Sequence, residues 1–156
     1  MKFKQLLIAL AAVSALAHAA DTPGSNPSVR TPTVSERLAT ARAAIQAKDW
    51  TKALNELNTA AREDSRNADV QNLLGYSYRK RATPDLAKAF EHYGNALRLD
   101  PKHKGAHEYI GEAYLMDKKP AEAEKHLAQL EAICGNRTCE EYTDLSKAIA
   151  DYKKAN

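Results

Sequence analysis

Apolar residues after position 33 recur three and four residues apart, and no stretch alternates between apolar and polar residues as a strand would. This spacing places the apolar side chains on one stripe of a helix. Segments of about 13 to 16 residues carry the pattern, and turn signals separate them: Asp49, Thr83-Pro84, Asp100-Pro101 and Lys119-Pro120. We therefore predict an all-α fold.

Small and large residues recur along this helical part at a nearly constant interval. Four sets of positions share it: Ala41, Gly75 and Gly111; Ala44, Tyr78 and Tyr114; Ala53, Ala89 and Ala123; Leu57, Tyr93 and Leu127. The first two sets are spaced by 34 and then 36 residues, and the last two by 36 and then 34. The change locates a two-residue insertion between Tyr78 and Ala89, at the turn of residues 80–84. Such a period indicates a repeat architecture.

The repeating unit resembles the tetratricopeptide repeat (TPR), a pair of antiparallel helices of about 34 residues. The second copy matches the family signature best, through Leu74-Gly75, Tyr78, Ala89, Tyr93, Ala96 and Leu99-Asp100-Pro101. The third copy keeps Ile110-Gly111, Tyr114, Ala123 and Leu127, and the first keeps Asp49-Trp50, Ala53, Leu57 and Ala60. The resemblance implies a right-handed TPR solenoid of three helix-turn-helix repeats, at about residues 34–67, 68–103 and 104–134.

The C-terminal segment has the pattern of a helix that covers the last repeat. A repeat stack leaves one apolar face open at its end, and a capping element must cover it. One apolar stripe with steps of three, four and three is formed by Tyr142, Leu145, Ile149 and Tyr152. Thr138 and Glu141 have capping-box spacing, as do Thr33 and Glu36 at the start of the first helix. We expect a capping helix at about residues 139–153, within a TPR domain of residues 34–153.

The first 19 residues have the pattern of an export signal. Lys2 and Lys4 precede an apolar run from Leu6 to Leu16, and Ala17-His18-Ala19 is a small-x-small cleavage motif. The alternative, a retained membrane anchor, is disfavoured because about 20 residues are needed to span a bilayer. We predict a Sec-type signal peptide cleaved after Ala19, a periplasmic or secreted protein, and a flexible leader over residues 20–33, which contain three prolines and a glycine.

Charge excludes some classes of partner. The whole chain has a formal net charge of +3, and the two lysines of the signal peptide account for most of it. A nearly neutral mature chain has no general attraction for nucleic acid or an anionic membrane. We therefore expect a protein or peptide partner, with no nucleic-acid binding and no stable membrane insertion after signal cleavage.

The two cysteines, Cys134 and Cys139, lie between the third repeat and the predicted capping helix. In an oxidising compartment an isolated pair indicates a disulfide. A redox-active pair is the alternative, but its cysteines are more usually two residues apart. We expect a structural disulfide that fixes the angle between two helices.

Residues that carry chemistry are few. The sequence has no phosphate-binding loop, no nucleophile motif and no HExxH motif, so we predict no catalytic residue, no cofactor and no enzymatic activity. His103 and His107 are four residues apart, and His92 and His126 occupy equivalent places in successive repeats. We expect His92 and His126 on the outside of the stack, whereas a zinc site needs three or four converging ligands. A metal carrier is the weakest alternative.

The TPR resemblance implies that the binding surface is the concave face, lined by the first helix of each repeat. Its candidate residues, all expected to be exposed, are Arg42, Asn72, Tyr76, Arg79, Lys80, Glu108, Glu112, Leu115 and Met116. Three of them, Arg42, Arg79 and Lys80, suit a carboxylate through charge-assisted hydrogen bonds. An apolar side chain suits Tyr76, Leu115 and Met116.

These features together predict a non-enzymatic periplasmic TPR scaffold that binds a peptide segment of another protein. It would act as an adaptor or chaperone in envelope assembly or in the maturation of exported proteins. The main alternative is a structural or self-associating subunit of an envelope complex.

Overall fold

The structure is a computed structural model that describes residues 30–156. The predicted signal peptide and nearly all of the predicted leader lie outside these residues. The described part forms seven α-helices and no strand. None of its helices is both long and apolar enough to cross a membrane.

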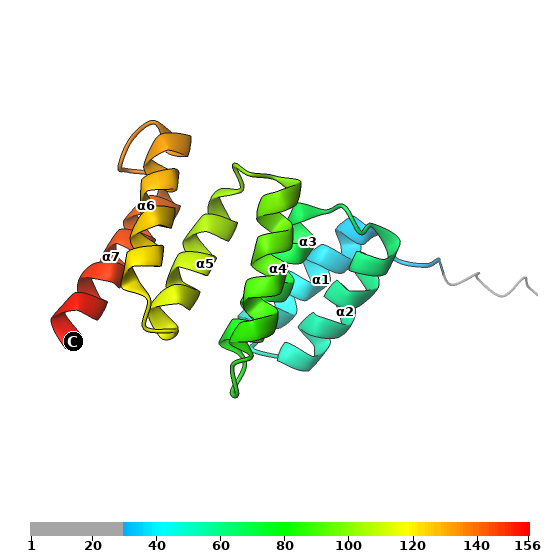
Figure 1. The fold of residues 1–156 in the computed structure, drawn as a ribbon. Helices are drawn as coiled ribbons and strands as arrows, with labels where there is room; N and C mark the ends of the chain where they lie inside the picture. Colours follow the sequence, from blue (N-terminus) through cyan, green and yellow to red (C-terminus); the bar gives the residue numbers. More distant parts are fainter. Residues whose placement is uncertain (1–29) are drawn as a thin grey trace, which may run out of the picture. The chain divides into compact units, whose positions relative to one another are not determined.

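The helices follow one another as antiparallel pairs (Figure 1), with bounds α1 (Val34–Gln46), α2 (Trp50–Glu63), α3 (Ala68–Lys80), α4 (Leu86–Leu99), α5 (Lys104–Met116), α6 (Pro120–Cys134) and α7 (Glu140–Ala155). The closest packing is within the pairs α1–α2, α3–α4 and α5–α6, while α2–α3 and α4–α5 join successive pairs. Helix α7 packs against both α5 and α6. The predicted all-α helical solenoid is confirmed.

Three apolar clusters hold the stack together, one at each junction. The first, between the first two pairs, contains Ala41, Leu57, Ala60, Val70, Leu73 and Leu74. The second, between α4 and α5, contains Ala89, Tyr93, Ile110 and Ala113. The third contains Leu115, Ala123, Leu130, Leu145 and Ile149, so α7 covers the apolar face that the last pair leaves open. The small repeat residues Ala53, Ala89 and Ala123 are fully buried, which lets the paired helices approach closely.

The two-residue insertion lies in the turn where the sequence places it. Helix α3 ends at Lys80 and α4 begins at Leu86. The turn is closed by a hydrogen bond from the Asp85 N–H to the Tyr78 carbonyl (3.0 Å) and by one from Arg81 Nε to the Thr83 carbonyl (2.8 Å). The longer turn therefore leaves the helices on either side in register.

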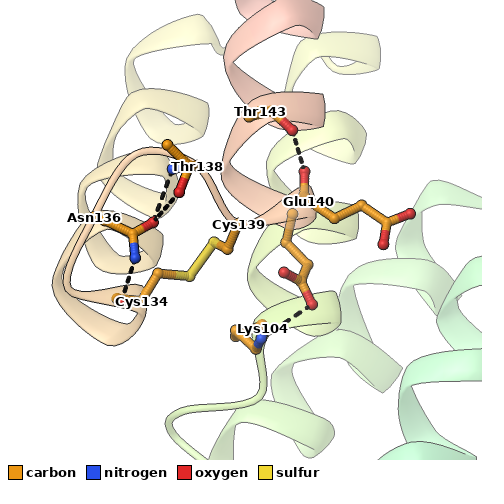
Figure 2. Close-up of a disulfide and its surroundings, with 8 residues drawn as sticks. Lys104, Cys134, Asn136, Thr138, Cys139, Glu140 and Thr143 are labelled. Carbon is orange, nitrogen blue, oxygen red and sulfur yellow. Dashed lines mark hydrogen bonds and ion pairs between the residues drawn. A yellow bond between two sulfur atoms is a disulfide. The ribbon is translucent and has the colours of Figure 1, made fainter.

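Helix starts follow local capping. The predicted box at Thr33 and Glu36 is present, with the Thr33 N–H 2.8 Å from the Glu36 carboxylate. The predicted box at Thr138 and Glu141 is wrong, because α7 begins at Glu140 with Cys139 as its N-cap. The Thr138 N–H and hydroxyl instead donate to Asn136 Oδ1 at 2.8 and 2.9 Å, which ties Thr138 into the preceding loop (Figure 2).

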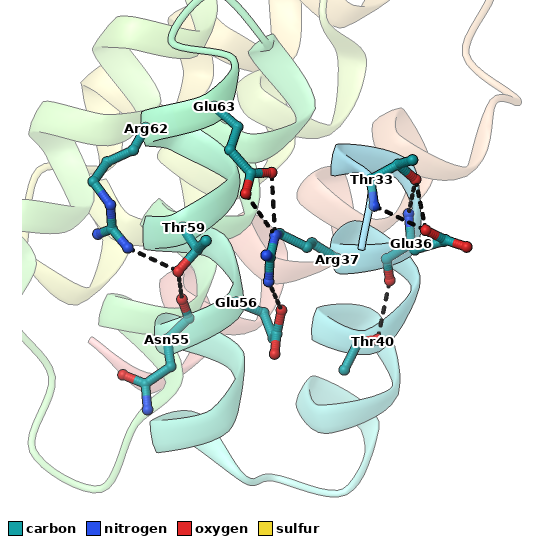
Figure 3. Close-up of polar contacts among 9 residues, drawn as sticks. All are labelled: Thr33, Glu36, Arg37, Thr40, Asn55, Glu56, Thr59, Arg62 and Glu63. Atoms are coloured by element: carbon teal, nitrogen blue, oxygen red, sulfur yellow. Dashed lines mark hydrogen bonds and ion pairs between the residues drawn. The ribbon is translucent and has the colours of Figure 1, made fainter. Parts of the chain in front are cut away.

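Arg37 fixes the first helix pair. Its Nε is 3.1 Å from the Glu63 carboxylate and its Nη1 is 3.0 Å from the Glu56 carboxylate (Figure 3). The Arg37 side chain is largely buried at 13% exposure, so water screens these contacts less than those of an ordinary surface pair. Glu56 and Glu63 both lie on α2, about two helical turns apart, so Arg37 holds α1 against α2 at two points.

Candidate functional site

The odd-numbered helices α1, α3, α5 and α7 line one face, which we call the odd-helix face. Residues at related places of successive helices meet across it. Arg42 lies 3.9 Å from the Asp69 carboxylate, and the rings of Tyr76 and Tyr109 are 4.8 Å apart. Lys104 Nζ is 3.6 Å from the Glu141 carboxylate. The capping helix α7 therefore extends the face formed by the first helices of the three repeats.

A pocket opens on this face between α1, α3 and α5. It has a volume of about 200 Å³ and is lined by Arg42, Ile45, Gln46, Leu73, Tyr76 and Tyr109. Sequence reasoning missed Tyr109. By the 36-residue spacing between the second and third repeats it corresponds to Leu73, one helical turn before Tyr76, so the repeat spacing contained a signal that places both rings on the same face.

Arg79 is buried, so its predicted exposure is wrong. Its side chain is 4% exposed and forms an ion pair with Glu112 at 2.5 Å. The Nε atom donates to the Tyr93 hydroxyl at 3.2 Å, and the guanidinium lies over the rings of Tyr76 and Tyr109, 5.4 and 5.7 Å from their centroids. The last turn of α3 packs between α4 and α5, which surround this side chain. The contacts of the Arg79 guanidinium are therefore all with other residues of the domain.

Three further candidates are buried instead of exposed. Leu115 is 8% exposed and belongs to the apolar cluster that α7 covers, so a partner cannot contact it as we predicted. Asn72 is 5% exposed, and within the described residues its Oδ1 has no hydrogen-bond partner. Glu108 is 8% exposed. Exposure was misjudged because a helix in a stack is flanked by neighbours on both sides, which cover polar positions as well as apolar ones.

The other candidates reach solvent. Arg42, Lys80 and Met116 are exposed, and Tyr76 and Glu112 are partly buried. Lys80 Nζ lies 6.0 Å from the centroid of the Tyr76 ring, close enough for a weak cation–π interaction. The structure places these residues on the odd-helix face, while their role in binding stays a prediction.

Glu108 has the most perturbed carboxyl group of this face. Burial is the main cause and raises its pKa from an ordinary value of 4.5 to about 8. The charges of Glu112, Asp144 and Glu141 raise it further, whereas Arg79 lowers it. Asp144 and Glu141 belong to the capping helix, and sequence reasoning assigned no functional residue there.

His107 and His126 are in contact. His126 was expected on the outside of the stack, but its Nδ1 is 2.9 Å from Nδ1 of His107 on α5. His107 Nε2 lies 3.0 Å from the Pro101 carbonyl and must donate to it, so His107 Nδ1 accepts a hydrogen bond from His126. Burial, and then the nearby His107, lower the pKa of His126 to about 4.

The other two histidines have separate local partners. His103 caps α5 by accepting from the Ala106 N–H at 3.1 Å. His92, also predicted on the outside, is half-buried and stacks on Tyr78. In the described part of the chain, the one group of three possible metal ligands is Cys134, Cys139 and Glu141, and both of its sulfurs are in a disulfide.

The predicted disulfide is present. Cys134 ends α6 and Cys139 immediately precedes α7, and their Cα atoms are 6.3 Å apart (Figure 2). Gly135 has a φ of +69°, the left-handed conformation in which glycine ends a helix without strain. The disulfide and this turn set the angle at which α7 meets α6.

Residues 8–116 match the family model described as Tetratricopeptide Repeats-Sensor (TPR-S). The DnaJ protein P58IPK homolog A of Oryza sativa subsp. japonica is 34% identical over 94 residues, which are 60% of this chain and 19% of that protein. The chain thus spans about a fifth of the length of this relative.

Among solved structures, the type III secretion translocator chaperone SycD of Yersinia enterocolitica, in an alternative dimer, is similar in fold. The TM-score is 0.66 at 20% identity, over 82% of this chain and 94% of SycD. At this identity, the likeness concerns the fold alone.

Proposed function

The chain belongs to the tetratricopeptide-repeat family, and from this premise we propose that it is a non-enzymatic scaffold that binds a segment of another protein on its odd-helix face. One observation carries the proposal. Polar and aromatic side chains line this face, and a pocket between α1, α3 and α5 opens on it, with Arg42, Tyr76 and Tyr109 in its walls. An open pocket with aromatic and charged walls suits a side chain of a bound segment.

The composition of this pocket supports the same role. Its walls combine the rings of Tyr76 and Tyr109, the aliphatic Ile45 and Leu73, and the exposed guanidinium of Arg42. Recognition sites typically combine an apolar lining with a few placed polar groups. The pocket suits one apolar side chain of the segment, with a carboxylate near Arg42.

The setting that we propose is the periplasm, where the chain would act as an adaptor or chaperone in envelope assembly or exported-protein maturation. The export pattern of residues 1–19 supports this location. The names of the two relatives support a chaperone-like role, since one is a DnaJ protein and the other a translocator chaperone. This support is by analogy, because a shared fold does not determine function.

Crosslinking in envelope extract, followed by capture of the full chain, tests the proposal. The informative variant is Arg42→Ala with Lys80→Ala, which leaves the internal ion pair of Arg79 intact. A matched control is Lys125→Ala with Lys147→Ala, which removes the same charge from lysines that are 70% and 76% exposed. We expect the wild type and the control to capture the same protein, and the odd-helix variant to lose it.

A self-associating subunit is the second candidate, because Met116, at 46% exposure, is the one large apolar side chain of the described residues that is exposed. Equal capture by all three forms, or capture of only a second copy of the chain, would refute the scaffold and favour self-association. Met116→Ser would then shift the oligomeric state in analytical ultracentrifugation.

A further inference from the structure

We propose that Glu108 binds a cationic side chain, a lysine or an arginine, of the protein segment held on the odd-helix face. This inference rests on the proposed function and assigns a subsite within the same surface. Glu108 lies on α5, between α3 and the capping helix α7.

Glu108 lacks the partner that a buried carboxyl group needs. Its side chain is 8% exposed, and it has no hydrogen bond or ion pair with another of the described residues. Charged groups are almost never buried without a partner, because burial removes their hydration. Its oxygens are not among the fully enclosed polar atoms, so they still reach the surface of the odd-helix face. A ligand can therefore contact the carboxyl group from outside.

The surroundings of Glu108 are acidic, and the nearby cations are already engaged. Glu112 faces it from α5, and Glu141 and Asp144 face it from α7. Arg79 on α3 is paired with Glu112, and Lys104 on α5 is paired with Glu141. Among the described residues, Glu108 and Asp144 form no ion pair, and Arg79 offsets the surrounding negative charge only in part. A cation brought by a partner is therefore attracted to this site.

Burial and the three neighbouring carboxylates keep Glu108 protonated, because Arg79 lowers its pKa only in part. Its pKa of about 8 means that the carboxyl group is mostly neutral at pH 7. A bound ammonium or guanidinium group favours the ionised form, so binding must release the proton. The affinity for a cationic segment therefore rises with pH until Glu108 ionises by itself.

An organic cation fits this site better than a metal ion. Among the described residues, no three carboxyl groups at Glu108 have ligand atoms close enough to share one ion, and Glu141 is grouped only with the two disulfide cysteines. A lysine or arginine side chain needs no such convergence, and its long apolar stem can lie along Tyr109. Arg42 lies on α1, at the other end of the series of odd-numbered helices from α7. The bound segment would therefore have its acidic or C-terminal group toward α1 and its basic residue at Glu108.

The test uses two short probes and the full chain. The probes are acetyl-Gly-Arg-Gly-amide and its neutral isostere, acetyl-Gly-citrulline-Gly-amide, each added at millimolar concentration. Carbon-13 NMR of the glutamate carboxyl groups follows the titration of Glu108, whose signal is identified by its loss in Glu108→Gln. We expect the arginine probe to lower the titration midpoint and the citrulline probe to leave it unchanged.

The dissociation constant of the arginine probe should fall by about tenfold or more between pH 6.5 and pH 8.5, as proton linkage requires. Glu108→Gln should abolish this change, and Glu91→Gln, an identical substitution at an exposed site on α4, should preserve it. Equal effects of the two probes on wild-type Glu108 would overturn the inference without relying on the folding of any variant.

The two proposals fail separately. If a client is captured through Arg42 and Lys80 while the arginine probe leaves Glu108 unchanged, the scaffold stands and the cation subsite is wrong. If the arginine probe binds as expected but no client is captured, the subsite stands and the proposed function is wrong.

Discussion

Gly75 on α3 lies directly against the ring of Tyr93 on α4, and a Cβ atom at position 75 would come within 2.6 Å of Tyr93 Cδ1. The ring is fully buried, and its hydroxyl accepts the hydrogen bond from Arg79 Nε. The small residue of the repeat signature thus has a role beyond close packing of two helices. It sets the position of the ring that orients Arg79 behind the odd-helix face.

Gly75→Ala should therefore lower the free energy of unfolding, although alanine favours helices. The substitution forces the Tyr93 ring to move, and overpacking of a core typically costs about 1–3 kcal/mol. The gain of about 1 kcal/mol in helix propensity offsets only part of this cost. Urea unfolding followed by circular dichroism measures the difference.

Gly94 provides the matched control for that substitution. It lies within α4, and a Cβ atom there would meet no atom within 4 Å. Gly94→Ala should raise the free energy of unfolding by about 0.5–1 kcal/mol, because alanine loses less backbone entropy on folding. Equal stability of the two variants would contradict the tight contact at Gly75.

Arg79→Ala should destabilise the fold far more than Lys80→Ala. The first substitution leaves the Glu112 carboxylate without its cation and the Tyr93 hydroxyl without its donor, and breaking a buried ion pair costs about 3–5 kcal/mol. Lys80 is exposed, so its removal should change stability by less than about 0.5 kcal/mol. Guanidinium unfolding compares the two. A small effect at Arg79 would mean that it is available to a partner after all.

The fold was predictable because repeat spacing constrains it at every level. Positions such as Ala53, Ala89 and Ala123 must be small wherever two helices approach closely, and this requirement leaves a period in the sequence. The insertion near Lys80 follows from the same spacing, and the apolar stripe of α7 follows from the three- and four-residue steps of a helix. Only local detail was missed, as at Thr138, where a side chain of the loop competes for the groups that would cap the helix.

The site was less predictable, because it depends on contacts between helices distant in sequence. Helical spacing indicates which residues share a face, but it does not reveal that Arg79 meets Glu112 or that His107 meets His126. Exposure was likewise misjudged at Asn72 and Glu108, since the neighbouring helices cover these polar positions. A polar residue on a predicted outer face says little about burial until the neighbour that packs beside it is known.

Replacing both Cys134 and Cys139 by serine should lower the melting temperature by a few degrees without unfolding the domain. The disulfide closes a short loop, for which chain entropy predicts a loss of about 2 kcal/mol. A reductant should reproduce the shift in the wild type and have no effect on the double variant. Hydrogen exchange should locate the loss in α7. Complete unfolding would show that the disulfide is needed to form the domain.

Glu108 should make the domain less stable as pH rises. Its pKa is about 8 in the folded chain and 4.5 ordinarily, so the folded state holds a proton that the unfolded state releases. Stability therefore falls as pH rises from about 4.5 and becomes constant above 8. Between pH 6.5 and 8.5 the urea midpoint of the wild type should fall more than that of Glu108→Gln. Parallel curves would contradict the raised pKa.

His126 should make the domain less stable as pH falls below neutral. Its pKa is about 4 in the folded chain against 6.5 ordinarily, so unfolding takes up a proton between these values. Its contribution is therefore lost as pH falls from 6.5 to 4. His126→Asn keeps a donor near His107 Nδ1 but does not titrate, so its urea midpoint should fall less in acid.

His92, whose pKa burial also lowers, contributes in the same direction, and His92→Asn separates the two effects. If His126→Asn loses as much stability in acid as the wild type while His92→Asn loses less, the acid sensitivity comes from His92 and not from His126.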